Sequence, residues 1–408
     1  MITLRLFSFH KLSSAIALSF MLGLRSISAV DTPPAPLSMV IQQAFTASAQ
    51  QYRWLLAQPP LAGKFPRSFE HNQLITITAK DWTSGFFPGS LWYLYEATGD
   101  AQWREAATRF TEQLEKVQYN TGTHDVGFIL MSSYGQGYRL TGNAAYRPII
   151  LQGAISLSTR FNTKIGSLKS WDRPATAFTF PVIIDNLMNL ELLLWAARNG
   201  GEPQARTIAL THADTGLKNH FRPDGSSVHV VDYDPVTGQI IRRITHQGFS
   251  NDSSWSRGQA WALYGYTMLY RETRELRYLA QAEKIAAFII NHPRLPADKI
   301  PYWDFDAPQQ PEPGRDASAG AIICSALFEL ASLTKNPTAA AQYAALAETQ
   351  LRSLASPAYF AAVGTNGGFL LKHGTGNQPK KSEIDAPLNY ADYYFLEALH
   401  RAQANRAR

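Results

Sequence analysis

One local pattern recurs along the chain: a helix rich in aromatic or leucine residues, a short polar turn, and a second, more polar amphipathic helix. The first example joins the segment 91–100 to the segment 101–117. Further first and second helices are expected at 134–143 with 144–161, 190–197 with 203–221, 260–270 with 276–291, and 321–333 with 338–354. The final helix, 391–401, is expected to pack against the first one, 38–56.

Apolar first helices and amphipathic second helices predict an inner and an outer layer. Six such hairpins that close into a ring make an all-α fold, the (α/α)6 barrel. An open helical solenoid is the alternative, and the aromatic-rich segments between the helices argue against it. The longest of these segments, 222–254, predicts a small β-hairpin in a loop at one barrel end, with strands at 228–232 and 239–245 around a turn at 234–238.

The first 29 residues resemble a leader rather than part of the fold. Two basic residues precede an apolar stretch at 15–24, which is too short to span a bilayer, and small residues follow up to Ala29. The sequence predicts a signal peptide at 1–29 and a single catalytic barrel domain at 30–408. An uncleaved membrane anchor is the alternative. We therefore expect a periplasmic or secreted protein with no membrane contact after cleavage.

Charge and cysteine content narrow the possible partners. The formal charge of +6 falls to about +3 without the first 29 residues, which hold three basic residues and no acidic one. This mild charge fits a small anionic substrate and gives no case for nucleic acid. Cys324 is the only cysteine, so neither an internal disulfide nor a cysteine-based metal cluster is expected. No phosphate loop or zinc-protease motif occurs, so we predict no cofactor and no metal.

Two aspartates have the same position in neighbouring hairpins. Asp185 lies between the apolar run 180–184 and the apolar segment 187–195, and Asp125 precedes the first helix of the second hairpin. If the hairpins follow one another around a ring, both carboxylates lie at the same end and face one funnel. Like charges raise one pKa, and two facing carboxyl groups are the usual equipment for cleaving glycans. The alternative is that both aspartates are helix N-caps, a role compatible with catalysis.

A second cluster, residues 245–261, combines polar and aromatic side chains. Arg257 lies between Trp255 and Trp261. Tryptophans stack on sugar rings and an arginine fork binds a carboxylate at two points, whereas the alternative is loop-to-helix packing. Segments 81–89 and 301–305 have similar composition, and together these segments predict an aromatic-rimmed pocket. His229, on the expected hairpin, either polarises a substrate hydroxyl or is an ordinary strand histidine.

Five motifs together resemble glycoside hydrolase family 88, the unsaturated glucuronyl hydrolases. They are Asp-Trp-Thr-Ser-Gly-Phe-Phe-Pro-Gly at 81–89, His-Asp-Val-Gly-Phe at 124–128, Ile-Asp-Asn-Leu-Met at 184–188, Trp-Ser-Arg-Gly-Gln-Ala-Trp at 255–261 and Asp-Tyr-Tyr-Phe-Leu-Glu-Ala-Leu at 392–399. The resemblance extends from residue 81 to the C-terminus and also implies the (α/α)6 barrel.

The resemblance implies hydration of the C4=C5 double bond of an unsaturated glucuronic acid at the non-reducing end of an oligosaccharide. The enzyme would therefore act downstream of a polysaccharide lyase, which generates this substrate. Asp185 matches the general acid/base position, and Asp125 matches the second acidic position. Positions matched to substrate binding are Trp82, His124, His229, Gln247, Trp255, Arg257 and Trp261. No metal or organic cofactor is implied.

Alternatives to this function remain open. The nearest is an unsaturated rhamnogalacturonyl hydrolase that acts on pectin fragments. A glycan-binding barrel without activity and a helical interaction scaffold belong to other classes. The parent polysaccharide is also open, with glycosaminoglycan, ulvan and gellan fragments all possible. Lys380 and Lys381, in the stretch 373–382, would either contact a sulfate group or be solvated loop charges.

Overall fold

The computed structural model describes residues 35–58, 61, 63–172, 178–309 and 311–406. From Pro36 onward the chain forms one compact unit. The expected signal peptide at 1–29 lies outside the described residues. Within the described part, no helix is long and apolar enough to cross a membrane.

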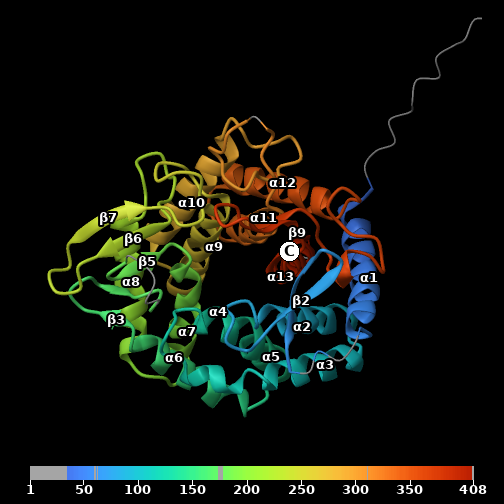
Figure 1. Cartoon of the computed structure of the whole chain (residues 1–408), viewed down its shortest axis with the longest axis horizontal. Coiled ribbons are helices and arrows are strands. Elements are labelled where there is room, and N and C mark those ends of the chain that lie inside the picture. Colours follow the sequence, from blue (N-terminus) through green and yellow to red (C-terminus); the bar gives the residue numbers. More distant parts are fainter. Residues whose placement is uncertain (1–34, 59–60, 62, 173–177, 310, 407–408) are drawn as a thin grey trace, which may run out of the picture. The chain divides into compact units, whose positions relative to one another are not determined.

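Helices arranged in two layers around a ring make up most of this unit (Figure 1). Each inner helix contacts the next inner helix, and the last of them, α13, contacts both α11 and α2, which closes the ring. In the described part of the chain, the six inner positions are α2 (Phe86–Thr98), a broken helix made of α4 (Val126–Leu130) and α5 (Gln136–Thr141), α7 (Asn186–Arg198), α9 (Ser256–Thr273), α11 (Ala317–Leu333) and α13 (Asn389–Arg406).

The outer layer consists of the second helix of each hairpin. The outer helices are α3 (Ala101–Glu112), α6 (Tyr146–Ser158), α8 (Gln204–Asn219), α10 (Leu276–Asn291), α12 (Pro337–Leu354) and α1 (Leu37–Leu56), which contacts α13. This is the predicted pairing of the first helix with the last. The predicted (α/α)6 barrel is therefore confirmed.

Most inner helices begin about one turn before the predicted residue. Helix α9 begins at Ser256 rather than 260, and α11 begins at Ala317 rather than 321. In the second hairpin the helix begins at Val126, and a π-helical turn, η2 (Met131–Gly135), separates α4 from α5. The first turns of α7, α9 and α13 contain polar residues such as Asn186, Arg257 and Asn389, so their sequences resemble loops. Arg257 and Tyr390 in the first turns of α9 and α13 line the candidate site described below, and its other residues come from the loops and hairpins that precede the inner helices.

The predicted β-hairpin is present with slightly different bounds and belongs to a larger sheet. Strands β6 (Val230–Tyr233) and β7 (Ile240–Ile244) pair antiparallel, and β5 (Pro181–Ile183) adds a third strand with Val182 opposite Val231. The apolar run before Asp185 is therefore a buried sheet strand rather than part of the barrel wall. Strand β5 leads directly into α7, which fixes Asp185 between the sheet and the ring.

The sequence did not predict three further hairpins. They are β1 (Phe65–Glu70) with β2 (Gln73–Ile77), β3 (Phe161–Asn162) with β4 (Ser167–Leu168), and β8 (Gly374–Asn377) with β9 (Ser382–Ala386). Two short 3-10 helices, η1 (Glu115–Tyr119) and η3 (Asn366–Gly368), complete the described elements. Strands β1 and β9 contact each other, although they come from opposite ends of the chain.

A network of ion pairs and hydroxyl groups lies where the inner helices end. The Glu397 carboxylate accepts hydrogen bonds from Tyr93 and Tyr264, both at 2.9 Å, and from Ser325 at 2.6 Å. Arg271 pairs with Glu191 and Glu329. Each of these charged groups has a partner of opposite charge or a hydroxyl donor, as buried charges require. The network therefore accounts for the polar residues at this end of the ring.

Gly127 is expected to be essential for the contact between α4 and α7. A Cβ atom at Gly127 would lie 2.6 Å from Cα of Asn189, and the neighbouring Phe128 N–H donates to Oδ1 of Asn189 at 2.7 Å. Gly127→Ala should lower the free energy of unfolding by about 1–3 kcal/mol, because backbone atoms must move. Denaturant unfolding measures this loss. Gly314→Ala is the control, since its Cβ would have no neighbour closer than 3.9 Å; equal losses in both variants would contradict the prediction.

Candidate active site

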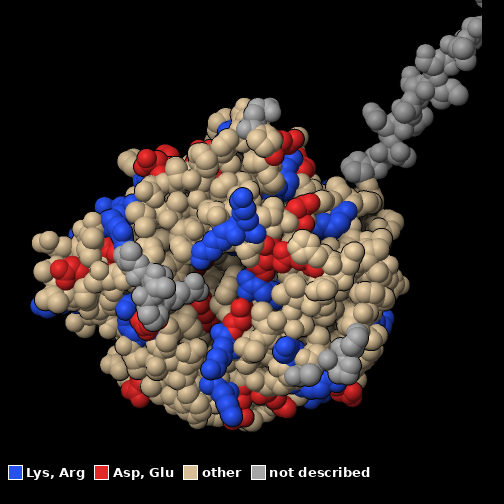
Figure 2. Space-filling view, viewed as in Figure 1, with Lys and Arg blue, Asp and Glu red and all other residues tan. Residues whose placement is uncertain are grey.

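A cavity of about 190 Å³ opens at the end of the ring where the inner helices begin. At ~30 Å³ per water molecule in the liquid, this volume corresponds to roughly six waters. Figure 2 shows acidic and basic side chains next to one another around a hollow near the middle of this face. Residues lining the cavity are Arg67, Trp82, His124, Asp125, Trp171, Ile183, Asp185, His246, Gln247, Arg257, Gly376, Asn377, Lys380, Ser382, Glu383 and Tyr390.

Asp185 is the N-cap residue of α7, but its carboxylate does not cap the helix. The residue has helical φ and ψ angles, and no side-chain cap hydrogen bond is formed. The side chain lines the cavity while the residue is only 8% exposed. Burial raises the pKa of Asp185 to about 7; the Asp125 carboxylate adds to this rise, and the Arg257 guanidinium opposes it. A carboxyl group of this pKa can donate and accept a proton near neutral pH.

Asp125 lies at the start of α4 and faces the same cavity. It also forms no side-chain cap bond to its helix. Its Oδ2 accepts a hydrogen bond from the Thr123 hydroxyl at 2.6 Å, and its Oδ1 lies 3.3 Å from Nε2 of His124. The structure therefore brings the two predicted aspartates and His124 together at one cavity. Capping alone explains the position of neither carboxylate.

Arg257 lines the cavity, but its guanidinium fork is already occupied. One terminal nitrogen donates to Asp316 Oδ2 at 2.8 Å and to the Thr375 carbonyl. The other donates to Gln247 Oε1 at 2.9 Å and to the Gly376 carbonyl. The predicted bidentate grip on a substrate carboxylate is thus unavailable in this arrangement. Instead, Arg257 holds strand β8 against α9 and supplies a fixed positive charge beside Asp185.

Three other predicted binding residues lie behind the cavity wall rather than on it. Trp261 is fully buried and packs between Phe128 and Tyr394, at centroid distances of 5.1 and 5.4 Å. Trp255 and His229 stack on each other at 4.4 Å. Of the three tryptophans predicted to bind substrate, Trp82 alone lines the cavity. The segment 301–305 is also buried except for the partly exposed Tyr302. Its Asp304 accepts a hydrogen bond from the Phe249 N–H at 2.9 Å, which supports the loop that carries Gln247.

Several cavity residues were not predicted from the sequence. Arg67 on β1 forms ion pairs with Asp81 and with Glu383 on β9, and all three are at least partly buried. Trp171 and His246 lie together on another side, with ring centroids 5.4 Å apart. Tyr390 lies in the first turn of α13, just before the motif at 392–399. Burial raises its pKa. Arg67 and Glu383 carry no local signal, since 316 positions separate them.

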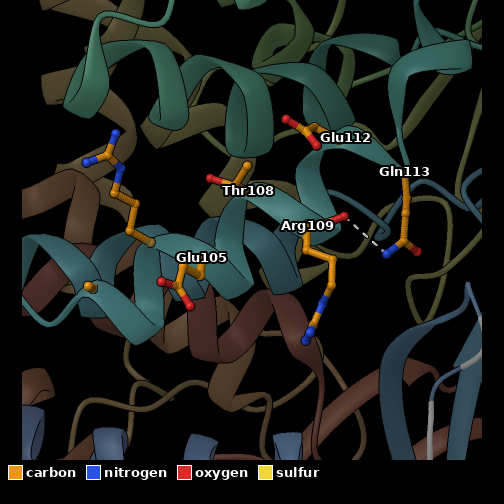
Figure 3. A pocket seen from close by; sticks show the side chains of 7 residues that line it. Glu105, Thr108, Arg109, Glu112 and Gln113 are labelled. Atoms are coloured by element: carbon orange, nitrogen blue, oxygen red, sulfur yellow. Dashed lines mark hydrogen bonds between the residues drawn. The ribbon is translucent and has the colours of Figure 1, made fainter.

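Another hollow runs along one outer helix (Figure 3). All of its lining residues, from Ala101 to Gln113, lie on or directly after α3. Charges of both signs alternate along this face, and the dashed bond drawn there joins the Gln113 amide to the Arg109 carbonyl at 3.1 Å. No predicted site residue lies there. Among the described residues, no group of three or more His, Cys, Asp or Glu side chains is placed to hold a metal ion.

Comparison with known proteins gives consistent matches over most of the chain. Residues 60–404 match the family model of Glycosyl Hydrolase Family 88. An unsaturated glucuronyl hydrolase from Formosa agariphila is 45% identical over 366 residues, which cover 89% of this chain and 90% of that protein. An unsaturated glucuronyl hydrolase from Bacillus sp. strain GL1 is 34% identical, with 83% and 92% covered. A crystal structure of an unsaturated glucuronyl hydrolase specific for heparin has a TM-score of 0.87 and 46% identity, covering 91% of this chain and 99% of that one.

Burial of the Asp185 carboxylate should destabilise the protein at high pH. Its folded pKa of about 7 exceeds the ordinary value of 3.8. Between these values the unfolded chain releases a proton that the folded chain keeps, so the free energy of unfolding falls as pH rises. Asp185→Asn, which resembles the neutral acid, should therefore raise this free energy by about 2–4 kcal/mol at pH 8 and change it little at pH 4.

Urea unfolding at both pH values measures this effect. Asp214→Asn is the matched control, because Asp214 is half-exposed and paired with Arg277 at the outer layer. A stabilisation by Asp185→Asn that is equal at pH 4 and pH 8 would contradict the prediction.

Proposed function

The chain belongs to glycosyl hydrolase family 88 and is a glycoside hydrolase, and we propose that it removes 4,5-unsaturated glucuronic acid from the non-reducing end of lyase-generated oligosaccharides. The observation that carries this proposal is Asp185: a buried carboxyl group that lines a cavity, beside a second carboxylate, with a pKa of about 7. A reaction that begins with protonation of a carbon–carbon double bond needs an acid in its neutral form, and burial provides it.

The reaction follows from this acid. Protonated Asp185 transfers its proton to C4 of the enol ether, and positive charge develops at C5 and the ring oxygen. The resulting carboxylate then takes a proton from a water molecule, which adds its oxygen to C5. The hemiketal opens, the hemiacetal at C1 collapses, and the remaining sugar is released. One residue thus acts first as acid and then as base, a cycle suited to a pKa near the working pH.

The surrounding charges support both halves of the cycle. Asp125 raises the pKa of Asp185 and favours its neutral form, while Arg257 favours the carboxylate that activates water. Asp125 also offers acceptor oxygens to the sugar hydroxyls. The amide nitrogen of Gln247 remains as a donor, because its oxygen is bound to Arg257. Trp82 provides an aromatic face in contact with Tyr390, at a centroid distance of 5.0 Å.

For the substrate class we propose glycosaminoglycan-type fragments. One similar solved structure is described as specific for heparin, and another as responsible for the degradation of glycosaminoglycan. Lys380 lines the cavity, whereas Lys381 does not. The exposed ammonium group of Lys380 is therefore available to an anionic group on the sugar next to the uronate. A polysaccharide lyase must supply this substrate, because only elimination leaves the C4=C5 double bond.

Two aspartate variants test the reaction. The unsaturated uronate absorbs ultraviolet light, and hydration removes the absorbance. Wild type should bleach heparin- or chondroitin-derived disaccharides, with a rate that falls above neutral pH. Asp185→Asn should lower kcat by about 10²–10⁴-fold, the usual worth of a general acid/base. Asp125→Asn should bind substrate and turn over about 10- to 100-fold more slowly, which corresponds to one charged hydrogen bond.

Asp214→Asn serves as the control and should match wild type. Bleaching of pectin-derived unsaturated rhamnogalacturonyl fragments alone would favour the rhamnogalacturonyl hydrolase. Binding without bleaching of any substrate would favour a glycan-binding barrel without activity.

We also propose that residues 1–29 direct export and are removed near Ala29, leaving a periplasmic or secreted enzyme. The support is the order of basic, apolar and small residues in this segment. Sequencing the N-terminus of the exported protein should find a start close to Val30. An N-terminus that still begins at Met1 in a membrane fraction would favour the uncleaved anchor.

A further inference from the structure

His229 is buried directly behind the cavity wall. It immediately precedes β6, is 4% exposed, and is not among the residues that line the cavity. Its Nε2 atom is shielded from solvent. His229 therefore forms no part of the described cavity lining. Any effect of this side chain on the reaction has to pass through a neighbour.

The hydrogen bonds of His229 define which ring nitrogen carries the proton. Nδ1 accepts hydrogen bonds from the backbone N–H groups of His246 at 3.1 Å and Gln247 at 3.2 Å. A nitrogen that accepts has no proton of its own, so the proton of the neutral ring is on Nε2. Burial holds the pKa of His229 well below its ordinary value, and the ring is neutral at physiological pH.

The Nε2 atom of His229 lies near the catalytic carboxylate. Nε2 of His229 lies 3.9 Å from Oδ2 of Asp185. Both atoms are buried, and neither forms another hydrogen bond. An unpaired buried donor and an unpaired buried acceptor each cost free energy, so a small approach of the two is favourable. Hydrogen bonds of catalytic groups are commonly long in the empty site and shorten when substrate binds.

Packing fixes the ring in this orientation. Trp255 lies between two groups: its ring is 4.4 Å from the His229 ring, and the Arg257 guanidinium lies 4.6 Å from the centre of the Trp255 ring. Trp255 and Arg257 are themselves almost fully buried. The imidazole is therefore held from one side by stacking and at Nδ1 by two backbone donors.

The same arrangement occurs at the second aspartate. The Asn189 oxygen accepts from the Phe128 N–H, so its amide nitrogen is the group that lies 3.4 Å from Nδ1 of His124. The proton of His124 is then on Nε2, which lies 3.3 Å from Asp125 Oδ1. Each aspartate thus has a buried histidine whose Nε2 atom lies within 4 Å of a carboxylate oxygen, at 3.3 Å for His124 and 3.9 Å for His229.

We propose that His229 is a positioning residue that donates its Nε2–H to Oδ2 of Asp185, so that Oδ1 is the oxygen that gives and takes the proton of the reaction. This inference rests on the proposed function. A carboxylate whose rear oxygen is held by a fixed donor cannot rotate, and its front oxygen stays directed at the substrate. The same donor stabilises the ionised form, which is the form that activates water.

Other charges near this pair remain in place when the histidine is replaced. Arg257 from α9 and Asp125 from the start of α4 act on Asp185. His246, Arg257 and His220 act on His229. Substitution of His229 replaces none of these side chains, although His246 lies in the loop that Nδ1 of His229 holds. The pKa of Asp185 therefore reports loss of the Nε2–H donor, with burial and the two charges present in every variant.

Two amide variants separate the functions of the two ring nitrogens. His229→Asn places an amide oxygen near the position of Nδ1, where it can accept from His246 and Gln247, but it leaves no donor near Asp185. His229→Gln places its amide nitrogen near the position of Nε2, which keeps a donor toward Asp185 but loses the acceptor for the loop. The two amides differ by one methylene group and are matched controls for each other.

The pKa of Asp185 is measured by NMR titration of ¹³C-labelled aspartate, and in parallel by the alkaline limb of the kcat profile. In His229→Asn both should move to higher pH by about one unit, as expected when a carboxylate loses one hydrogen bond. In His229→Gln both should stay near the wild-type position, while KM rises because the Gln247 loop is less well held. Equal shifts in both variants, or no shift in His229→Asn, would overturn the proposal.

The two readouts distinguish this inference from the proposed function. A wild type that bleaches no unsaturated uronate contradicts the proposed function, and the NMR titration then still decides whether His229 donates to Asp185. A wild type that bleaches the substrate, with an unshifted pKa in His229→Asn, leaves the function standing and removes His229 from it.

Discussion

The remaining architecture depends on the contacts of α13 with α11 and α2, which close the ring. This helix, the last in the chain, fills the gap between α11 and α2 and is covered on the outside by α1. Its Asp392 accepts hydrogen bonds from Tyr52 on α1 and from the backbone of Leu370 and Leu371. With the ring closed, every inner helix begins at the same end. The segments that lead into these helices then surround one small cavity.

That cavity combines two opposing electrostatic requirements. A carboxyl group has to be neutral to donate a proton to carbon, and it has to be ionised to accept one from water. Burial between β5 and α7 satisfies the first requirement by raising the pKa of Asp185. Arg257 contributes to the second, but only because Asp316 and the carbonyls of β8 hold it in place. Arg257 thus lines the cavity wall and also supplies a positive charge that acts on Asp185.

The sequence predicted the helical hairpins well because apolar periodicity is a local property of each helix. The first turns of α7, α9 and α13 were missed for a physical reason: they contain polar residues, as loops do. The burial of Trp255 and Trp261 was missed for a similar reason. A tryptophan in a core and a tryptophan that stacks on a sugar occur in similar local sequences. The links of Arg67 to Glu383 and of Arg257 to β8 span more than one hundred residues, so no local pattern signals them.

The position of α13 has a consequence for how the chain reaches its native state. Tyr52 and Asp392 are 340 residues apart, and Tyr390 from the same helix forms part of the cavity wall. Contacts this distant in sequence form late, because a long loop must close first. During synthesis the ring therefore stays open, and the active site incomplete, until the final helix leaves the ribosome. Assembly of the cavity therefore waits for α13 to take its place between α11 and α2.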